Sequence, residues 1–442
     1  MGLTGLEIYK HLPKTNCKEC GSPTCLAFAM ALASGKASLD QCPYVSDEAK
    51  EALDSAAAPP IKLVKVGTGD NVVEIGDETE LFRHDKKFFH PTGIAVAIKD
   101  TADVAKEAEH FDQLEFYRVG LDLITDMVAV VNDSGDGAKF KEAAETVASK
   151  TNKAMVLVSE DPGAMEQALE AVAERNPLVY AATEDNYEKM TELAKSKGCP
   201  LGVKAKDLNH LAELSQKISD LGYTELVLDS GARETSQVIA DMTQMRRQAI
   251  KKKFRPFGFP TIAFTSKEDP QEEVLQAGAY ISKYASIVVV NAKEKQQLLP
   301  LVSWRLNLYT DPQKPIQVEA GLYPVGDANE NSPVYVTTNF SLTYFIVQGE
   351  VENSRIPSYI LCIDTGGISV LTAYADNKFD GEIIAKKMKE NDLDSKVNHK
   401  KIIIPGGVAV LKGSLEDESG WEVMVGPREA AGIPKFAKEN FA

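Results

Sequence analysis

The sequence predicts an α/β protein in three parts: a small cysteine-rich N-terminal domain, a central (β/α)8 barrel and a smaller C-terminal α/β domain. Four of the six cysteines lie within the first 42 residues, and short apolar runs alternate with longer amphipathic ones through the middle of the chain. Near the C-terminus, each apolar run ends in small residues. The length of 442 residues also fits three domains of ordinary size.

The composition is that of a folded protein, and the net charge argues against nucleic acid as a partner. Hydrophobic residues make up 43% of the chain and charged residues 26%, with a formal net charge of -16 at pH 7. That sign argues against a general phosphate-backbone binder, so we expect no nucleic acid partner. No apolar run approaches the roughly 18 residues that span a bilayer, and the start MGLTGLEIYKHL lacks the pattern of a secretory signal. We therefore expect a soluble, cytoplasmic protein with no membrane partner.

The cysteines of the first domain follow the spacing Cys17-x2-Cys20-x4-Cys25-x16-Cys42. Clustered thiols in a reducing cytosol are more often metal ligands than disulfides. The apolar stretch LAFAMALAS predicts a helix that ends near Gly35 and returns the chain toward the first three thiols. Four converging thiolates suit a four-iron four-sulfur cluster. The alternatives are an all-cysteine zinc site, which usually carries a second Cys-x2-Cys pair that is missing here, and cysteines without a ligand.

The first domain boundary falls in EALDSAAAPPIKL, where a helical pattern gives way to two prolines, so this domain is placed at residues 1–58. The barrel is placed at residues 59–312, because eight βα units over roughly 250 residues match a (β/α)8 barrel. An open doubly wound sheet is the alternative. The predicted strands are GIAVAI, MVAVV, AMVLV, PLVYAA, PLGV, ELVLD, PTIAF and SIVVV.

The stretch TDPQKPIQVEAGLYPVGDANENSP predicts an interdomain linker, and the C-terminal domain is placed at residues 325–442. Its predicted strands lie in PVYVTTNF, IPSYILCIDTGG, HKKIIIPGG and GWEVMVGPRE. Ligands of open α/β sheets sit outside the carboxyl ends of strands, so the small residues there predict one ligand crevice. Ordinary βα turns and helix caps are the alternative. No loop matches Gly-x-Gly-x-x-Gly or the P-loop, so neither a dinucleotide nor a triphosphate is supported.

Four blocks of the sequence together resemble one protein family. They are GLEIYKHLPKTNCKECGSPTCLAFAMALASGKASLDQCPY, LVLDSGARETS, the long block from VYVTTNF to DNKFDGE, and the block from IIIPGG to MVGPREA. These blocks, in this order, are similar to the large subunit of corrinoid/iron-sulfur proteins of the reductive acetyl-CoA pathway. The resemblance covers essentially the whole chain. The cysteine block alone is not specific, whereas the C-terminal blocks make the match close.

The resemblance implies a methyl carrier. Such a subunit binds a cobamide in its C-terminal domain, at the interface with a smaller barrel subunit in a heterodimer. A methyltransferase passes a methyl group from methyltetrahydrofolate to Co(I), and methyl-Co(III) delivers it to the nickel site of acetyl-CoA synthase, which works with carbon monoxide dehydrogenase. The four-iron four-sulfur cluster returns inactive Co(II) to Co(I). Whether such a carrier counts as an enzyme is left open by the sequence.

The resemblance also implies which residues bind each cofactor. The cluster ligands are Cys17, Cys20, Cys25 and Cys42. The corrinoid contacts are Thr337, Thr338, Asn339, Phe340, Ser341, Asp364, Thr365, Gly367, Ser369, Leu371, Thr372, Ala373, Pro405, Gly406, Gly407, Val408, Ala409, Gly426, Pro427 and Arg428. The motif Asp-x-His-x-x-Gly is absent, which predicts a base-off cobamide without a protein histidine on cobalt. Thr372 is the candidate for the small residue below the cobalt, with a β-branched strand residue as the alternative.

A rival hypothesis is an iron-sulfur-containing, pterin-dependent methyltransferase whose barrel carries the active site. Asp229, Arg233 and Glu234 in LDSGARET follow a barrel strand, where barrel enzymes place catalysis. They indicate a vestigial pterin-type site or a docking surface, although a helix start with Asp229 as its cap and Glu234 in its first turn is the favoured interpretation.

The remaining motifs are given structural interpretations. A solvated loop is expected for His84, Asp85 and His90, and a surface position for His399. The basic run IKKKFR is expected to be a solvated helix end. The isolated Cys199 and Cys362 are expected to be buried and without a role.

Overall fold

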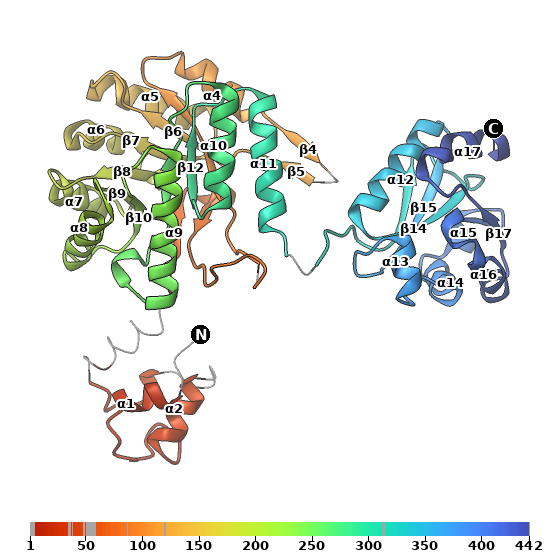
Figure 1. Ribbon diagram of the computed structural model, residues 1–442, viewed down its shortest axis with the longest axis horizontal. Helices are drawn as coiled ribbons and strands as arrows, with labels where there is room; N and C mark the ends of the chain where they lie inside the picture. The colour runs from red at the N-terminus through yellow and green to blue at the C-terminus, as the bar shows by residue number, and fades with distance from the viewer. Residues whose placement is uncertain are drawn as a thin grey trace.

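The computed structural model describes residues 5–33, 37, 39–46, 49, 59–85, 87–118, 121–311 and 314–441, with the main chain alone at 40 and 118 (Figure 1). The helix end expected near Gly35 and the domain boundary expected before Pro59 lie outside these residues. Among the described helices, none combines the length and the apolar character that crossing a membrane requires.

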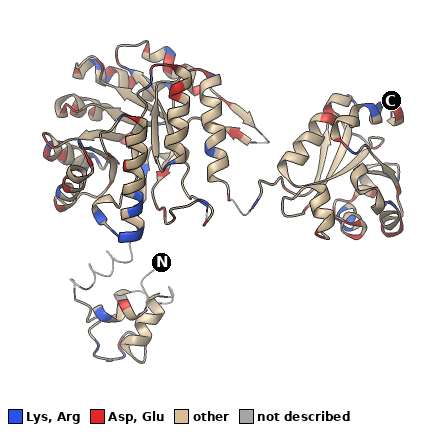
Figure 2. Ribbon diagram, viewed as in Figure 1, with Lys and Arg blue, Asp and Glu red and all other residues tan. Residues whose placement is uncertain are grey.

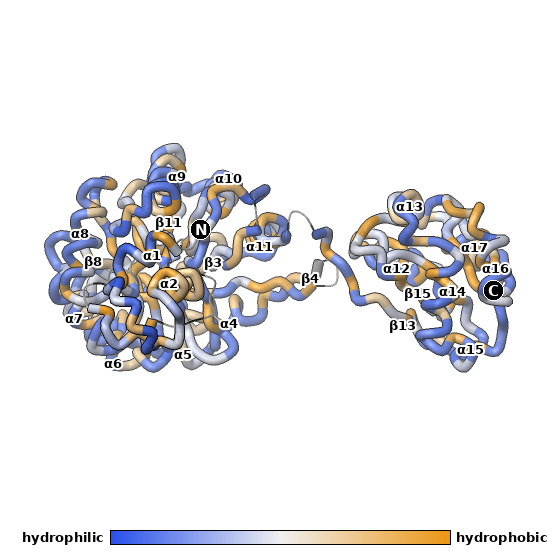
Figure 3. Tube along the Cα trace, turned by 90° about the horizontal axis from the view of Figure 1, so that it is seen from below, coloured by the Kyte–Doolittle hydropathy of each residue, from blue (hydrophilic) through white to orange (hydrophobic). Residues whose placement is uncertain are grey.

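The N-terminal elements are the helices α1 (Gly5–His11) and α2 (Cys25–Ala33) and the 3-10 turn η1 (Leu39–Gln41). Helix α2 is apolar along its length, because its sequence CLAFAMALA contains no charged residue (Figure 3). Its Phe28 packs with Ile8, Leu12 and Val45 in a core that also contains Cys25 and Cys42. A core of this size stabilises a domain only weakly, so a bound metal centre is expected to contribute to folding.

Eight parallel strands form the second group and close into the predicted barrel. They are β3 (Gly93–Lys99), β6 (Met127–Val131), β7 (Ala154–Val158), β8 (Leu178–Ala182), β9 (Leu201–Lys204), β10 (Leu226–Asp229), β11 (Ile262–Phe264) and β12 (Ile287–Val290). Successive strands pair in chain order and β12 pairs with β3. A bridge from Leu228 to Thr261 joins β10 to β11 and completes the ring. The predicted barrel is therefore confirmed over the open sheet.

One helix follows each barrel strand and covers the outside of the barrel (Figure 1). These helices are α4 (Val104–Asp112), α5 (Gly137–Lys150), α6 (Pro162–Val172), α7 (Tyr187–Lys197), α8 (Leu208–Asp220), α9 (Thr235–Lys252), α10 (Pro270–Ser282) and α11 (Lys295–Tyr309). Short 3-10 turns lie at η3 (Ala173–Arg175) and η4 (Arg255–Phe257). An aspartate side chain accepts the first free N–H groups of α4, α5, α6, α8 and α10, which fixes where these helices begin.

Two hairpins of the barrel were not predicted. The strands β1 (Val64–Val66) and β2 (Val73–Ile75), joined through η2 (Gly69–Asn71), pack their apolar side chains with the inward-facing residues of the barrel at its amino-terminal end. The strands β4 (Phe116–Arg118) and β5 (Leu121–Leu123) form a second antiparallel hairpin, which extends from the side of the barrel (Figure 1). Strands of three residues are too short to display a readable period, so the sequence did not indicate them.

The C-terminal domain is a five-stranded sheet in the order β13-β15-β14-β16-β17. Its strands are β13 (Leu322–Val325), β14 (Val334–Thr338), β15 (Ser358–Ile363), β16 (Lys401–Ile404) and β17 (Glu422–Val425). All pairs are parallel except the edge pair of β13 with β15. Its helical elements are α12 (Ser341–Ser354), α13 (Val370–Ala375), α14 (Gly381–Glu390), α15 (Leu393–Lys396), η5 (Gly406–Leu411), α16 (Lys412–Ser419), η6 (Ala430–Gly432) and α17 (Ile433–Phe441). The four predicted strands are confirmed.

The helices cover both faces of this sheet. Helices α12 and α17 contact each other and share a core with Tyr335, Ile360 and Ile403, whereas α14 and α16 pack over Val336 and Ile402 on the opposite face. Successive strand residues point to opposite faces, which is why neighbouring positions enter different cores.

The linker expected from Thr310 to Pro333 is wrong in part, because β13 lies within it and pairs with β15 over four residues. Pro324 hides this strand in the sequence, although an edge strand tolerates proline. The limits 1–58, 59–312 and 325–442 remain predictions, and the pairing of β13 favours an earlier start for the last domain.

Candidate functional site

The carboxyl edge of the C-terminal sheet has the topology of a ligand crevice. Strands β14 and β16 are neighbours, but the helix after β14 covers one face and the helix after β16 covers the other. The two connections therefore diverge and leave an opening at the strand ends. The four small-residue loops singled out in the sequence follow β14, β15, β16 and β17 at this edge.

A pocket opens beside these loops and is mainly apolar. It is lined by Tyr335, Val336, Thr337, Thr343, Val347, Val370, Leu371, Ile403, Ile404, Pro405, Gly407, Gly426, Pro427, Arg428, Ala430 and Ile433. Seven of these lining residues are predicted corrinoid contacts, namely Thr337, Leu371, Pro405, Gly407, Gly426, Pro427 and Arg428. The sequence did not indicate Tyr335, Thr343, Val347 and Ile433 as lining residues, because their approach to the pocket depends on the tertiary packing of α12 and α17.

Three buried hydroxyls at this edge have no hydrogen-bond partner. They belong to Tyr335, Thr337 and Thr338, whose exposed fractions are 4%, 1% and 0%. An unsatisfied buried polar group costs about 1–3 kcal/mol, so such groups indicate a missing polar partner. Burial raises the pKa of Tyr335 to about 12, so its hydroxyl keeps its proton at neutral pH and is able to donate.

Glycines bring the loops after β16 and β17 together. A Cβ at Gly406 would lie 2.5 Å from the carbonyl oxygen of Gly426, and one at Gly407 would lie 3.1 Å from Leu371 Cδ2. A side chain at Gly406 is therefore excluded by backbone, whereas one at Gly407 would crowd the pocket wall. The two loops form a cradle, in which the main chain of one loop lies against the main chain of the other.

Asn339 organises the loop that follows β15. Its Nδ2 donates to Asp364 Oδ1 at 3.0 Å, and its Oδ1 accepts from Thr365 N and Gly367 N, each at 3.0 Å. Nδ2 also donates to Gln317 Oε1 at 3.0 Å. The side chain is 2% exposed and all of its polar atoms are used within the protein. It therefore positions the crevice loops.

The other predicted corrinoid residues lie at or behind this edge. Phe340 is the N-cap of α12 and Ser341 begins that helix. The Ser369 and Thr372 hydroxyls are 3.0 Å apart at the start of α13, so the alternative of a strand residue for Thr372 is wrong. The side chains of Ala373 and Val408 belong to the hydrophobic core, and Ala409 is exposed in η5.

Three of the four cysteines of the N-terminal domain lie in or against one small core. Cys25 and Cys42 are buried in it, Cys20 packs against it, and Cys17 is exposed. The main-chain N–H of Asn16 donates to Cys25 Sγ at 3.4 Å. Lys14, Asn16, Lys18 and Gly21 all have positive φ, a conformation that turns backbone N–H groups toward the inside of a loop.

This donor set fits an iron-sulfur cluster chemically, because it offers four thiols, the ligands that such clusters use. Within the described residues, no three Cys, His, Asp or Glu side chains already form a metal site.

Asp229 and Arg233 form a buried network at the carboxyl end of the barrel. The Tyr180 hydroxyl donates to Asp229 Oδ2 at 2.5 Å, Arg233 Nη2 donates to the same oxygen at 2.9 Å, and Gly231 N donates to Oδ1 at 2.8 Å. The expectation that Asp229 caps a helix is wrong, because α9 begins after Glu234. With its oxygens satisfied in this way, Asp229 holds the barrel mouth together.

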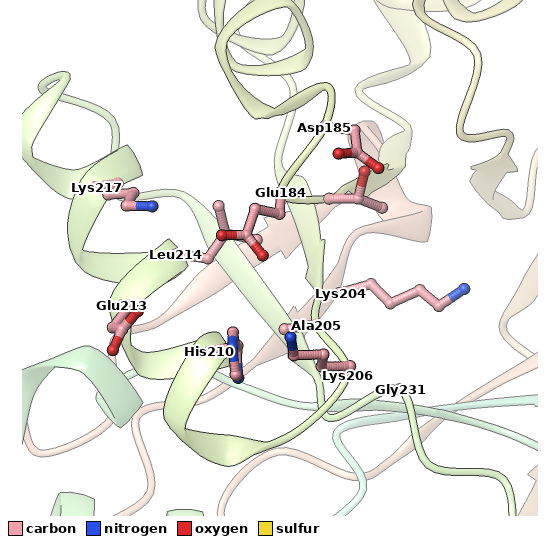
Figure 4. Close-up of a pocket in the computed structure, with 11 residues that line it drawn as sticks. Glu184, Asp185, Lys204, Ala205, Lys206, His210, Glu213, Leu214, Lys217 and Gly231 are labelled. Carbon is pink, nitrogen blue, oxygen red and sulfur yellow. The ribbon is translucent and has the colours of Figure 1, made fainter.

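A hollow at the barrel rim lies between the loops after β8 and β9 (Figure 4). Its charged lining residues are Glu184, Asp185, Lys204, Lys206, His210, Glu213 and Lys217. His210 is held by Asp207 at 2.9 Å and Lys204 by Glu160 at 2.7 Å. Charges of both signs line the hollow, so it selects no ligand class.

The remaining histidines lie outside the crevice. His84 is exposed and His90 lies 3.8 Å from Glu74, in agreement with a loop rather than a metal site. His399 Nε2 is 2.9 Å from the Ser332 carbonyl oxygen, at the amino end of β16.

Comparison with known proteins decides the family. The family model described as CO dehydrogenase/acetyl-CoA synthase delta subunit matches residues 63–437, and a model for an Fe-S cluster matches residues 12–44. The corrinoid/iron-sulfur protein large subunit of Moorella thermoacetica is 60% identical over 445 residues, covering 100% of both chains. The chain belongs to the corrinoid/iron-sulfur protein large-subunit family.

More distant members of the large-subunit family also align over almost the whole chain. The acetyl-CoA decarbonylase/synthase complex subunit gamma of Methanopyrus kandleri is 37% identical, covering 99% of this chain and 98% of the relative. Among solved structures, 7,8-dihydropteroate synthase from Vibrio fischeri aligns with 49% of this chain and 93% of its own, at 13% identity and a TM-score of 0.37. For this large subunit, the barrel is established by its own strand pairing.

Proposed function

We propose that this large subunit is the methyl carrier of its system, holding a cobamide at the C-terminal crevice and a four-iron four-sulfur cluster at the N-terminal cysteines. The single observation that carries the cobamide assignment is the crevice at the carboxyl edge, with its glycine cradle and the unpaired hydroxyls of Tyr335 and Thr337. When bound, the cobamide supplies a Co(I) centre that accepts a methyl group and releases it to an acceptor.

The protein's own residues bind and orient this group. The loops after β14 to β17 carry the predicted contacts, and Asn339 fixes the loop from Asp364 to Gly367. The Tyr335 and Thr337 hydroxyls are available as donors to the polar edge of the ligand. In a base-off cobamide the lower base does not bind cobalt and needs a separate binding site. The mainly apolar pocket behind the cradle suits this flat base.

The crevice is built without a histidine. Among residues 314–442 the sequence has one histidine, His399, which precedes β16, whereas the crevice lies beyond the other end of that strand. Thr372 remains our candidate for the residue below the cobalt, because it is exposed in the first turn of α13 and has only a small hydroxyl. These features support a base-off cobamide without a protein ligand.

A partner subunit is expected to cover the crevice. Large apolar side chains are exposed on the elements that follow the strand ends, among them Leu342 at 52%, Leu371 at 60% and Val410 at 70%. A cluster of exposed apolar residues around a crevice is typical of a protein interface. We propose that a smaller barrel subunit covers one side of the crevice. Acetyl-CoA synthase and the methyltransferase that uses methyltetrahydrofolate would then bind at the crevice in turn.

The cluster is proposed to restore Co(I) after oxidation to Co(II). Replacing Cys20 by Ala removes one thiolate and should abolish the cluster. With chemically prepared Co(I), the Cys20→Ala protein should accept one methyl group at the parent rate but should not recover after oxidation when electrons enter through protein donors. Cys362→Ala is the matched control and should recover normally. Equal recovery of the Cys20→Ala and parent proteins would contradict the repair role.

The rival function, a pterin-dependent methyltransferase in the barrel, has less support. Its main candidate, Asp229, has both carboxylate oxygens bound by Tyr180, Arg233 and Gly231, so it has no free oxygen with which to recognise a pterin.

A further inference from the structure

We infer that the basic end of helix α9 is the docking surface for an acidic, low-potential iron-sulfur protein that donates electrons to the N-terminal cluster. This inference rests on the proposed role of the cysteines as cluster ligands. The surface, called the basic patch below, consists of Arg247, Lys251, Lys252, Lys253 and Phe254.

The basic patch is an exception in a strongly acidic protein. The chain has 65 acidic residues, yet none occurs between Asp241 and Glu268. Arg247, Lys251, Lys252 and Lys253 are exposed, and none of them forms an ion pair within the described residues. The lysines stand out at the lower end of α9 (Figure 2).

A helix terminus alone does not account for this composition. Cations in the last turn are favoured by the helix dipole, but the effect fades beyond that turn and does not explain an exposed aromatic. Phe254 is 38% exposed and is held edge-on against Phe257, with ring centroids 5.2 Å apart. A fixed aromatic side chain beside exposed cations is typical of a protein-binding surface.

Lys253 adds an independent indication. It ends α9 in the left-handed conformation, with φ 51° and ψ 36°. Glycine is preferred at such positions, because a side chain there costs roughly 1–2 kcal/mol. A lysine at this position therefore retains a charge at the expense of local stability.

The basic patch adjoins the point where the N-terminal domain is attached. Arg255, next to Phe254, donates from Nη1 to the Pro59 carbonyl oxygen at 3.1 Å, and Lys62 N donates to the Gly258 carbonyl oxygen at 2.9 Å. A protein bound at the basic patch would therefore lie beside the attachment point of the cluster domain.

The charge pattern selects an acidic partner and orients it. The net charge of -16 repels such a protein over much of the surface, so productive encounters are favoured where cations cluster, as at the basic patch. In the step itself, one electron leaves the reduced centre of the donor and enters the oxidised cluster, whose iron-sulfur core changes from 2+ to 1+. No bond or proton is involved.

The test uses the full chain with its small subunit and both cofactors. The probe is an acidic two-cluster bacterial ferredoxin, reduced beforehand, and stopped-flow absorption follows reduction of the four-iron cluster. For Lys251→Glu/Lys252→Glu/Lys253→Glu we expect the rate at low ionic strength to fall tenfold or more, and the parent rate to fall as salt is added. Reduction by titanium(III) citrate should be unchanged. The control Lys139→Glu/Lys189→Glu/Lys197→Glu, with the same change in net charge, should behave as the parent.

A single substitution tests whether slower reduction could result from misfolding of the triple variant. Lys253→Gly should raise the unfolding temperature, because it removes the left-handed lysine, and should nevertheless slow reduction by ferredoxin. If the parent and the patch variants both hold four irons and ferredoxin reduces their clusters at equal rates, the docking surface is wrong and the proposed function stands. If the parent holds no iron, the proposed function is wrong. If a single-stranded RNA binds the parent through these lysines and the ferredoxin rate does not depend on them, the patch is a polyanion site and the inference is wrong.

Discussion

At the scale of single residues, the isolated cysteines Cys199 and Cys362 differ from the four clustered cysteines of the N-terminal domain. Cys199 and Cys362 are fully buried, and burial raises the pKa of the first thiol to about 11 and of the second to about 12. A thiol with so high a pKa stays protonated at pH 8 and is a poor nucleophile and a poor ligand. The expectation that these two have no role agrees with their surroundings.

This difference predicts a count of reactive thiols. With the cluster in place, iodoacetamide at pH 8 should modify none of the six cysteines. After removal of iron by a chelator, iodoacetamide should modify Cys17 and Cys20 directly, and Cys25 and Cys42 as the weakly stabilised N-terminal core opens. Only denaturation of the whole chain should expose Cys199 and Cys362. Mass spectrometry of peptides measures the pattern. Modification of Cys362 in the folded, iron-free protein would show that its environment differs from the one described.

At the scale of elements, the crevice depends on how four loops are held. Asn339 follows β14 in the sequence, yet its side chain fixes the loop after β15 and also reaches Gln317, which precedes β13. One side chain thus joins three segments that are distant in the sequence. This role could not be read from the sequence, where Asn339 appeared only as one of several small residues at a strand end.

We expect Asn339→Ala to disrupt the crevice. Leaving the buried N–H groups of Thr365 and Gly367 without an acceptor costs about 1–3 kcal/mol each, so the free energy of unfolding should fall by about 2–6 kcal/mol. Retention of the cobamide should weaken tenfold or more. Urea denaturation and equilibrium dialysis measure the two effects. Asn398→Ala, at an exposed position before β16, is the control and should change neither; a variant at Asn339 that retains the cobamide like the parent would contradict the positioning role.

Some elements were predictable and others were not, for physical reasons. The barrel strands are buried on both sides and read as apolar runs such as SIVVV, so their number and order followed from the sequence. The hairpin strands β1, β2, β4 and β5 are too short for a period, and Pro324 concealed β13. The crevice loops were predictable because glycine is required where backbones meet, whereas Tyr335, Thr343 and Ile433 line the pocket through long-range packing.

At the scale of the whole molecule, the chain separates two chemistries. The cysteine domain, which we propose receives electrons, precedes the barrel in the sequence and is attached to it at Pro59. The crevice lies in the domain that follows the barrel in the sequence. The barrel connects the two, and its own mouth is occupied by the Asp229 network. Its contribution is structural in this account, with the basic patch as its one further surface.

Metal analysis of the chain, purified without oxygen together with its small subunit, tests the central claim most directly. We expect one cobalt and about four irons per large subunit, because one crevice holds one cobamide and four thiolates hold one cluster. Iron without cobalt would contradict the methyl-carrier function and leave a cluster-bearing barrel protein in its place.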